Sequence, residues 1–422
     1  MTGGFERLDG ALACEGVPLE TIADAVGTPT YVYGSALVRE QYARLDRALD
    51  PVPHRLHYSV KANANGALLA LLRGLGAGVD IVSGGELYRA RRAGFGGADI
   101  VFSGVGKTAR ELREALAAGI LLVNVESEGE LRLLDRVAGE MGVAAPVALR
   151  VNPEVTVHTP HHYTRTGERG HKFGIPMDEA HGVAVLALSL PHIRLAGLDM
   201  HIGSQIAALE PYRNGMLRVM ALYERLTREG ARDIRYFDIG GGLAVTYDSE
   251  QPMDVEAFAA AILPTIAESG LTLLVEPGRF LVGNAGVLLT RVLYTKRSGE
   301  REYVIVDAGM NDLLRPSHYN AYHRIEAVRP RGGRVVADIV GPVCESGDFF
   351  ALEREVDAVR PGDLIVIHSA GAYGFSMAST YNSRPRPAEV LVDGDRFALA
   401  SERERYEDLV RHEPRHLDWR MG

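Results

Sequence analysis

The chain has 422 residues, of which 46% are hydrophobic and 24% charged, a composition typical of a globular protein. Its net charge of −9, without any block of basic residues, argues against nucleic acid or an anionic membrane surface as a partner. The two cysteines, Cys14 and Cys344, are too few for a disulfide framework or a cysteine-rich zinc site. They suit a reducing cytoplasm, and neither a secretory signal nor an apolar run long enough for a membrane helix is visible.

Eight short apolar, β-rich runs recur through the first two-thirds of the chain, at 55–60, 80–83, 99–103, 121–125, 146–151, 195–201, 235–239 and 271–276. Segments with helical spacing separate them, at 66–75, 85–94, 109–119, 127–141, 177–190, 211–230 and 254–270. This alternation predicts a parallel sheet covered by helices. An open doubly wound sheet has the same local pattern. Eight strands close a barrel, however, and no G-x-G-x-x-G follows the first strand, so the pattern favours a (β/α)₈ TIM-like barrel.

The pattern changes near residue 285. Runs at 301–309, 334–343, 363–369 and 388–400 are separated by turn residues without long helices, which predicts an antiparallel β-domain. The run at 31–34 precedes the first barrel strand and fits the same domain. We therefore predict an α/β protein with a barrel over 35–284, and a β-sandwich or barrel-like domain over 1–34 plus 285–422.

Polar residues follow five of the predicted barrel strands, where the chemistry of such barrels takes place. They are Lys61 and Asn63, Ser83 and Glu86, His201 with Ser204 and Gln205, the triplet Gly240 to Gly242, and Glu276 with Gly278 and Arg279. Each alone has an ordinary explanation, such as a solvated lysine or a helix cap. Their convergence on one rim predicts a binding site.

The combination of residue types indicates a ligand. Three glycines in succession let backbone N–H groups approach a phosphate. A lysine at a strand end can form a Schiff base with an aldehyde, a glutamate can pair with a pyridinium nitrogen, and a histidine can stack on a flat ring. Together these requirements describe pyridoxal 5′-phosphate. A phosphosugar site would leave Glu276 and His201 without a role.

Several segments carry a family resemblance, namely HYSVKANAN (57–65), DIVSGGEL (80–87), HIGSQ (201–205), DIGGGL (238–243), EPGR (276–279), RPSHY (315–319), CESGD (344–348) and GAYGFSMAS (371–379). From about residue 28 to 400 the sequence resembles the diaminopimelate decarboxylases, which are pyridoxal-phosphate enzymes of the alanine racemase and ornithine decarboxylase fold. The resemblance implies decarboxylation of meso-2,6-diaminopimelate to L-lysine and CO₂. It also implies a homodimer whose active sites are completed across the interface.

The resemblance also implies a role for each site residue. Lys61 would be the Schiff-base lysine, His201 would stack on the cofactor ring and Glu276 would pair with its nitrogen. The cofactor would further contact Ser204, Gly240, Gly241, Gly242, Gly278, Arg279 and Tyr373. Substrate would be bound by Arg279, Arg315, Tyr319, Glu345 and Tyr373, and Cys344 would donate the proton from a neighbouring chain.

Physical chemistry supports these roles. Loss of CO₂ leaves a carbanion, and Glu276 would keep the ring nitrogen protonated so that the ring accepts the electron pair. A thiol with an ordinary pKa of about 8.5 can reprotonate the α-carbon. Arginines such as Arg315 can clamp a carboxylate, and Glu345 can pair with an ammonium group.

Three alternatives remain open from the sequence: a decarboxylase of another amino acid or acyl group, a non-catalytic cofactor-binding homologue, and a racemase, which Glu276 opposes. We expect no metal site, although His158, His161, His162 and His171 cluster in one stretch. In the related family a loop with a TG…KFG pattern covers the site, and Thr166-Gly167 and Lys172 to Gly174 match that pattern.

Overall fold

The computed structural model describes residues 4–156 and 170–420. The chain divides into two compact units, Ser35–Ala285 and Met1–Gly34 with Gly286–Gly422. We call the first unit the barrel and the second the β-domain, and describe each by itself. Within the described residues no helix is long and apolar enough to cross a membrane.

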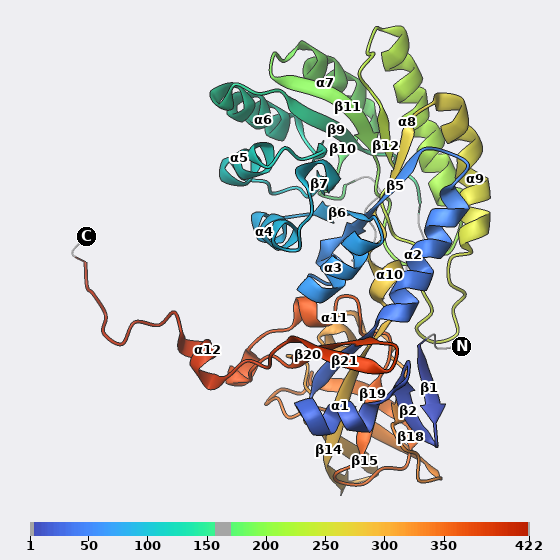
Figure 1. Ribbon diagram of the computed structural model, residues 1–422, viewed down its shortest axis with the longest axis vertical. Coiled ribbons are helices and arrows are strands. Elements are labelled where there is room, and N and C mark those ends of the chain that lie inside the picture. The colour runs from blue at the N-terminus through green and yellow to red at the C-terminus, as the bar shows by residue number, and fades with distance from the viewer. Residues whose placement is uncertain (1–3, 157–169, 421–422) are drawn as a thin grey trace. The chain divides into compact units, whose positions relative to one another are not determined.

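Eight parallel strands form the barrel (Figure 1). In spatial order they are β9 (Ala145–Asn152), β11 (Ile193–Asp199), β12 (Tyr236–Asp238), β13 (Thr272–Val275), β5 (His54–Ser59), β6 (Gly78–Ile81), β7 (Ile100–Phe102) and β8 (Leu122–Val125). Pairing of β8 with β9 closes the ring, and short β10 (Ile175–Pro176) pairs in parallel with the end of β9. The prediction of a closed barrel rather than an open sheet is confirmed.

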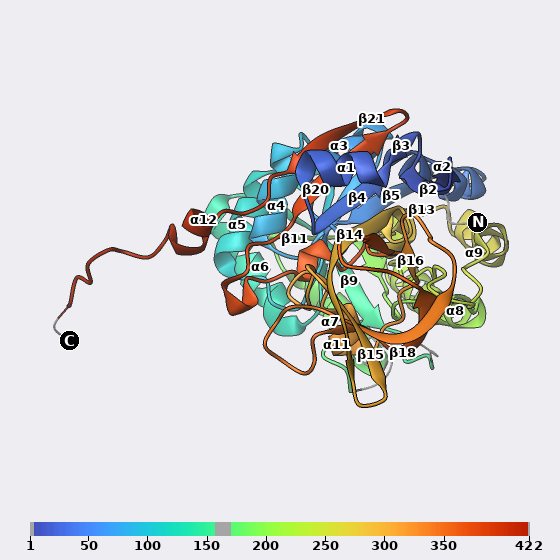
Figure 2. The same cartoon turned by 90° about the horizontal axis from the view of Figure 1, so that it is seen from below.

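Helices surround these strands (Figures 1 and 2). They are α2 (Ser35–Leu49), α3 (Gly66–Gly74), α4 (Gly84–Arg92), α5 (Ala109–Ala117), α6 (Glu128–Met141), α7 (Met177–Ser189), α8 (Glu210–Arg228), α9 (Val255–Ser269) and short α10 (Arg279–Val282). Side-chain capping determines where several of these helices begin. Thr108 and Glu111 form a capping box at α5, and the Ser127 side chain accepts from Glu130 N at α6.

The β-domain is built around the long strand β14 (Gly286–Ser298). The order of its main sheet is β18 (Phe349–Asp357), β17 (Arg334–Val340), β15 (Arg301–Val306), β14, β4 (Thr30–Gly34), β20 (Ala388–Asp393) and β21 (Arg396–Ser401). Off this path, β19 (Leu364–Ile367) pairs with β14 and β16 (Ile325–Ala327). The sheet is mixed rather than wholly antiparallel, because β15 pairs parallel with β17 and β4 with β20. Both pairs join strands that lie far apart in the sequence, which allows a parallel crossover.

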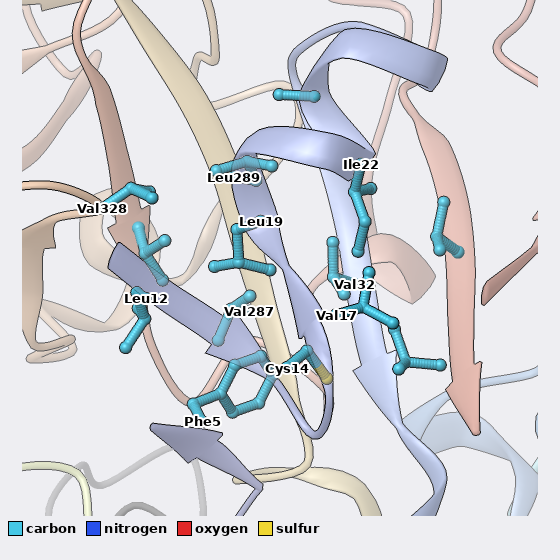
Figure 3. Packing of buried hydrophobic residues seen from close by; sticks show 14 residues of the cluster. Phe5, Leu12, Cys14, Val17, Leu19, Ile22, Val32, Val287, Leu289 and Val328 are labelled. Carbon is cyan, nitrogen blue, oxygen red and sulfur yellow. The ribbon is translucent and has the colours of Figure 1, made fainter. Parts of the chain in front are cut away.

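The N-terminal segment contributes the core shown in Figure 3. Strands β1 (Phe5–Leu8), β2 (Ala11–Cys14) and β3 (Val17–Pro18) form a small sheet that leads into α1 (Leu19–Val26). Leu19 and Ile22 of α1 pack in one buried cluster with Val287 of β14. Cys14 belongs to this cluster, and burial raises the pKa of its thiol, so Cys14 is an inert core residue.

Candidate active site

Lys61 lies in a short 3₁₀ turn, Val60–Ala62, directly after β5. Its Nζ is 3.2 Å from Oδ2 of Asp80, which is fully buried at the end of β6. The same carboxylate oxygen accepts a 2.7 Å hydrogen bond from Ser59 Oγ. The Lys61 ammonium is therefore held at the strand ends by a buried anion. Asp80 was not identified from the sequence. The available signal was an aspartate at the start of the predicted strand run 80–83, which the structure places near the end of β6.

Glu276 follows β13 and is buried, with 4% of its surface exposed. Its Oε1 accepts hydrogen bonds from Ser103 Oγ at 3.2 Å and from Asn124 Nδ2 at 3.4 Å. Asp238, at the end of β12, is also fully buried, and its carboxyl shares a hydrogen bond with Glu276. Two buried carboxyl groups this close disfavour ionisation of each other, because like charges repel strongly in a low-dielectric interior.

The electrostatics of this acid pair follow from its surroundings. Burial raises the pKa of Glu276 well above its usual value, and the charges of Asp238 and Asp80 raise it further. Lys61 and Arg150 act in the opposite direction. Burial also raises the pKa of Asp238, to about 8. A further cation placed beside Glu276 would favour its ionised form.

Arg150, on β9, is the centre of a buried charge network. Its Nη1 donates to Glu126 Oε1 at 2.8 Å, and its Nε lies 4.0 Å from Asp199 Oδ2. Glu126 also accepts from the backbone N–H groups of Gly104 and Gly174, each at 3.0 Å. The network therefore ties several strand ends together. Sequence reasoning did not identify Arg150, Glu126 or Asp199.

The glycine triplet after β12 leaves no room for side chains. A Cβ would come within 2.6 Å of His201 Nδ1 at Gly240, 2.1 Å of Glu276 O at Gly241 and 2.3 Å of Gly203 O at Gly242. Gly240 and Gly242 also adopt positive φ values of 70° and 94°. Only glycine satisfies both requirements at these two positions, so the backbone here carries no side chains.

His201 lies at the end of β11, beside this bare backbone. Its Nδ1 accepts a 3.1 Å hydrogen bond from Gly241 N. Burial lowers the pKa of His201 well below its usual value, and the charges of Arg150 and Lys61 lower it further. The ring is therefore neutral, a form that suits stacking on a flat ring rather than an ion pair.

Arg279 is buried and directed toward the same region of the barrel. Its Nη2 donates to Ser204 Oγ at 3.0 Å and its Nη1 to Tyr247 Oη at 2.6 Å. Gly278, just before it, packs so closely on the turn that carries Lys61 that a Cβ would lie 3.0 Å from Cβ of Ser59. The structure thus brings the predicted cofactor residues of the barrel, from Lys61 and His201 to Glu276 and Arg279, to the carboxyl ends of the strands.

The remaining predicted residues belong to the β-domain. Arg315 and Tyr319 lie on the short helix α11 (Arg315–Tyr319), where Arg315 is buried and Tyr319 half-buried. Arg315 Nη1 is 2.9 Å from His323 Nε2. Tyr373 adopts a left-handed backbone with φ of 57° in the segment after β19.

Cys344 and Glu345 are exposed on the turn between β17 and β18. Asp348 shapes this turn, since its Oδ1 accepts from Met310 N and its Oδ2 from Val343 N, both at 2.6 Å. Asn382 Oδ1 accepts from Cys344 N at 2.8 Å, and a hydrogen bond with Glu345 raises the pKa of Tyr381. The two exposed groups are thus presented by a turn with defined partners.

The stretch 157–169 lies outside the described residues, and with it His158, His161, His162 and Thr166-Gly167. The structure does describe the end of this loop pattern. Phe173 lies 5.1 Å from the Arg150 guanidinium, and Gly174 N bonds to Glu126. Among the described residues no group of histidine, cysteine or acidic side chains could hold a metal ion.

Comparison with known proteins identifies the class. Residues 35–283 match the family model described as "Pyridoxal-dependent decarboxylase, pyridoxal binding domain". The chain therefore belongs to the pyridoxal-dependent decarboxylases, in agreement with the lysine, glutamate and glycine arrangement of the barrel.

Individual relatives narrow the assignment. The chain is 49% identical to a diaminopimelate decarboxylase of Pseudomonas aeruginosa, over 96% of this chain and 97% of that protein. It is 47% identical to one of Aquifex aeolicus, over 96% of each. A crystal structure of the Helicobacter pylori diaminopimelate decarboxylase complexed with L-lysine matches with a TM-score of 0.90 and 39% identity, over 94% of this chain and 99% of that one. Within its class, the chain belongs to the diaminopimelate decarboxylase family.

Proposed function

We propose that this chain decarboxylates meso-2,6-diaminopimelate to L-lysine and CO₂, the last step of lysine biosynthesis, with pyridoxal 5′-phosphate as cofactor. The observation that carries the proposal is the buried Glu276 carboxyl, surrounded by acids, on the rim where Lys61 lies 3.2 Å from Asp80. A racemase needs a weaker electron sink and has no use for such a carboxyl. The relatives named above support the same reaction.

The residues present fit the cofactor. Bare backbone at Gly240 to Gly242, with Ser204 nearby, would hold its phosphate, and Gly278 and Arg279 would border that site. Lys61 would hold its aldehyde, and the neutral His201 ring would lie on its ring face. Glu276 would meet its ring nitrogen, a cation that offsets the cost of a carboxylate buried beside other acids. Bound there, pyridoxal phosphate would supply the sink for the electron pair left on the α-carbon when CO₂ departs.

Residues of the β-domain would select the substrate and complete the reaction. Arg315 and Tyr319 would bind a substrate carboxylate, with Arg279 and Tyr373 at the border with the cofactor. Glu345 would pair with the distal ammonium group of the substrate. The Cys344 thiol would deliver the proton from Sγ to the α-carbon.

We further propose the domain roles predicted from the sequence, with a cofactor-binding barrel over 35–284 and a β-domain over 1–34 plus 285–422 that completes the site and the dimer. The exposure of Cys344 and Glu345 supports a shared site, since both would become covered in a partner's active site. Cys14 and Cys344 are both unpaired thiols, which supports a cytoplasmic location.

Borohydride trapping tests the cofactor link. The loaded enzyme is reduced and digested, and the label is expected on the peptide that contains Lys61. A label on any other lysine would refute the assignment. Lysine formation from the meso, LL and DD isomers of diaminopimelate then tests the substrate, and turnover of another amino acid in preference to the meso isomer would refute it.

Mixing two inactive variants tests the shared site. Lys61→Ala and Cys344→Ala should each lack most activity. Random reassortment of their chains should restore about a quarter of wild-type activity, because half of the dimers are hybrids with one intact site. No recovery from a mixture shown to contain hybrids would contradict the shared-site dimer.

A further inference from the structure

A fully buried histidine lies against Arg315. The Nε2 atom of His323 is 2.9 Å from Arg315 Nη1, and its Nδ1 atom is 2.8 Å from the backbone oxygen of His368. A guanidinium donates only and a carbonyl accepts only. Nε2 must therefore carry a lone pair and Nδ1 the proton, so these two partners select the neutral imidazole in a single tautomer.

Backbone hydrogen bonds fix the segments that carry this contact. The backbone oxygen of His323 accepts a 2.5 Å hydrogen bond from Arg354 on β18, whose guanidinium stacks 4.1 Å above the ring of Tyr322. On the other side, His368 N donates to Arg324 O at 2.9 Å. The histidine is thus anchored to the segments around β18 and β19, whereas Arg315 lies on a helix of five residues.

We propose that His323 is a positioning residue that orients the Arg315 guanidinium toward the distal carboxylate of the substrate. This inference rests on the proposed role of Arg315. A neutral acceptor directs one arm of the guanidinium without cancelling its charge. An aspartate or glutamate in the same place would orient Arg315 equally well, but would compete with the substrate carboxylate for it.

Two ligands separate this role from general damage to the site. L-Lysine keeps the distal carboxylate of diaminopimelate, and 1,5-diaminopentane has the same chain and amines without any carboxylate. Their dissociation constants for the pyridoxal-phosphate-loaded enzyme are measured by calorimetry. Misorientation of Arg315 should weaken the binding of L-lysine but leave the binding of 1,5-diaminopentane unchanged.

Two substitutions each keep one of the two histidine contacts. In His323→Asn the amide nitrogen takes the place of Nδ1, so the bond to His368 remains while Arg315 lies out of reach. In His323→Gln the amide oxygen takes the place of Nε2 and can still accept from Arg315. We expect the asparagine variant to bind L-lysine at least about tenfold more weakly, the loss typical of one hydrogen bond to a charged group. Its affinity for 1,5-diaminopentane should change by less than about twofold, as should both affinities of the glutamine variant.

The alternative outcomes are decisive. A merely structural histidine would reverse the order, with glutamine the more damaging change. Equal losses for both ligands, or an asparagine variant that loses cofactor or melts early, would also overturn the proposal.

The Arg315→Met variant separates the proposed role of Arg315 from that of His323. If it leaves L-lysine binding intact, the carboxylate role of Arg315 fails. If it weakens binding while His323→Asn does not, only the role of His323 fails. His412→Asn, at an exposed position, is the control.

Discussion

Replacement of Arg150 by methionine probes the buried charge network of the barrel. The guanidinium is 2.8 Å from Glu126 and 4.0 Å from Asp199, and both carboxyl side chains are only 2% exposed. Arg150→Met preserves much of the aliphatic volume but leaves these acids without their cation. Removing one partner of a buried ion pair costs about 3–5 kcal/mol, so we expect a loss of that size in the free energy of unfolding.

The expected pH dependence has a definite sign. Burial raises the pKa of Asp199 well above its usual value, and Arg150 opposes that rise. Without Arg150 the folded-state pKa rises further above that of the unfolded chain. When folding raises the pKa of a carboxyl group, the free energy of unfolding of the protein decreases as pH increases. The deficit of Arg150→Met should therefore be larger at pH 8 than at pH 5.

Urea titration followed by circular dichroism measures these losses for the loaded enzyme at both pH values. Arg113→Met is a matched control, because it breaks a surface pair with Glu140 in which the side chains are 48% and 52% exposed. It should cost less than about 1 kcal/mol. Adding Glu126→Gln to Arg150→Met should recover at least about 1 kcal/mol, since one unpaired charge is removed. A loss no larger than that of the control, or a deficit that shrinks with rising pH, would refute the reasoning.

Three further predictions concern the site. Gly241→Ala places a Cβ 2.1 Å from the backbone oxygen of Glu276, and the resulting shift should weaken pyridoxal-phosphate binding at least about tenfold in equilibrium dialysis; unchanged retention would contradict the tight cradle. Asp80→Asn removes the anion that holds Lys61 and should lower kcat by about 10–100-fold with cofactor content retained, whereas wild-type kcat would show that this contact has no positioning role. Asp348→Ala leaves two backbone N–H groups without their acceptor, at about 1–3 kcal/mol each, and should lower both Tm and turnover; a normal Tm would be inconsistent with that hydrogen bonding.

The sequence alone determined the architecture of the barrel and the order of its site residues. Short, largely apolar runs mark the buried parallel strands, and segments with helical spacing separate them, so this local pattern suffices to count the strands. Strand ends fall where the apolar run stops, so Lys61, His201 and Glu276 could be assigned to a common rim. The family motifs then linked these positions to a cofactor and a reaction.

Only the tertiary structure decided which buried polar groups are partners. Asp80, Arg150 and His323 bind residues on other strands or turns, and strand periodicity predicts whether a side chain points inward but not which neighbour it meets. The same reason explains the mixed sheet of the β-domain. The parallel pairs of β15 with β17 and of β4 with β20 join distant segments, and long-range pairing leaves no local mark in the sequence. The sequence thus identified residues that carry chemistry, and the fold selected the residues that hold them in place.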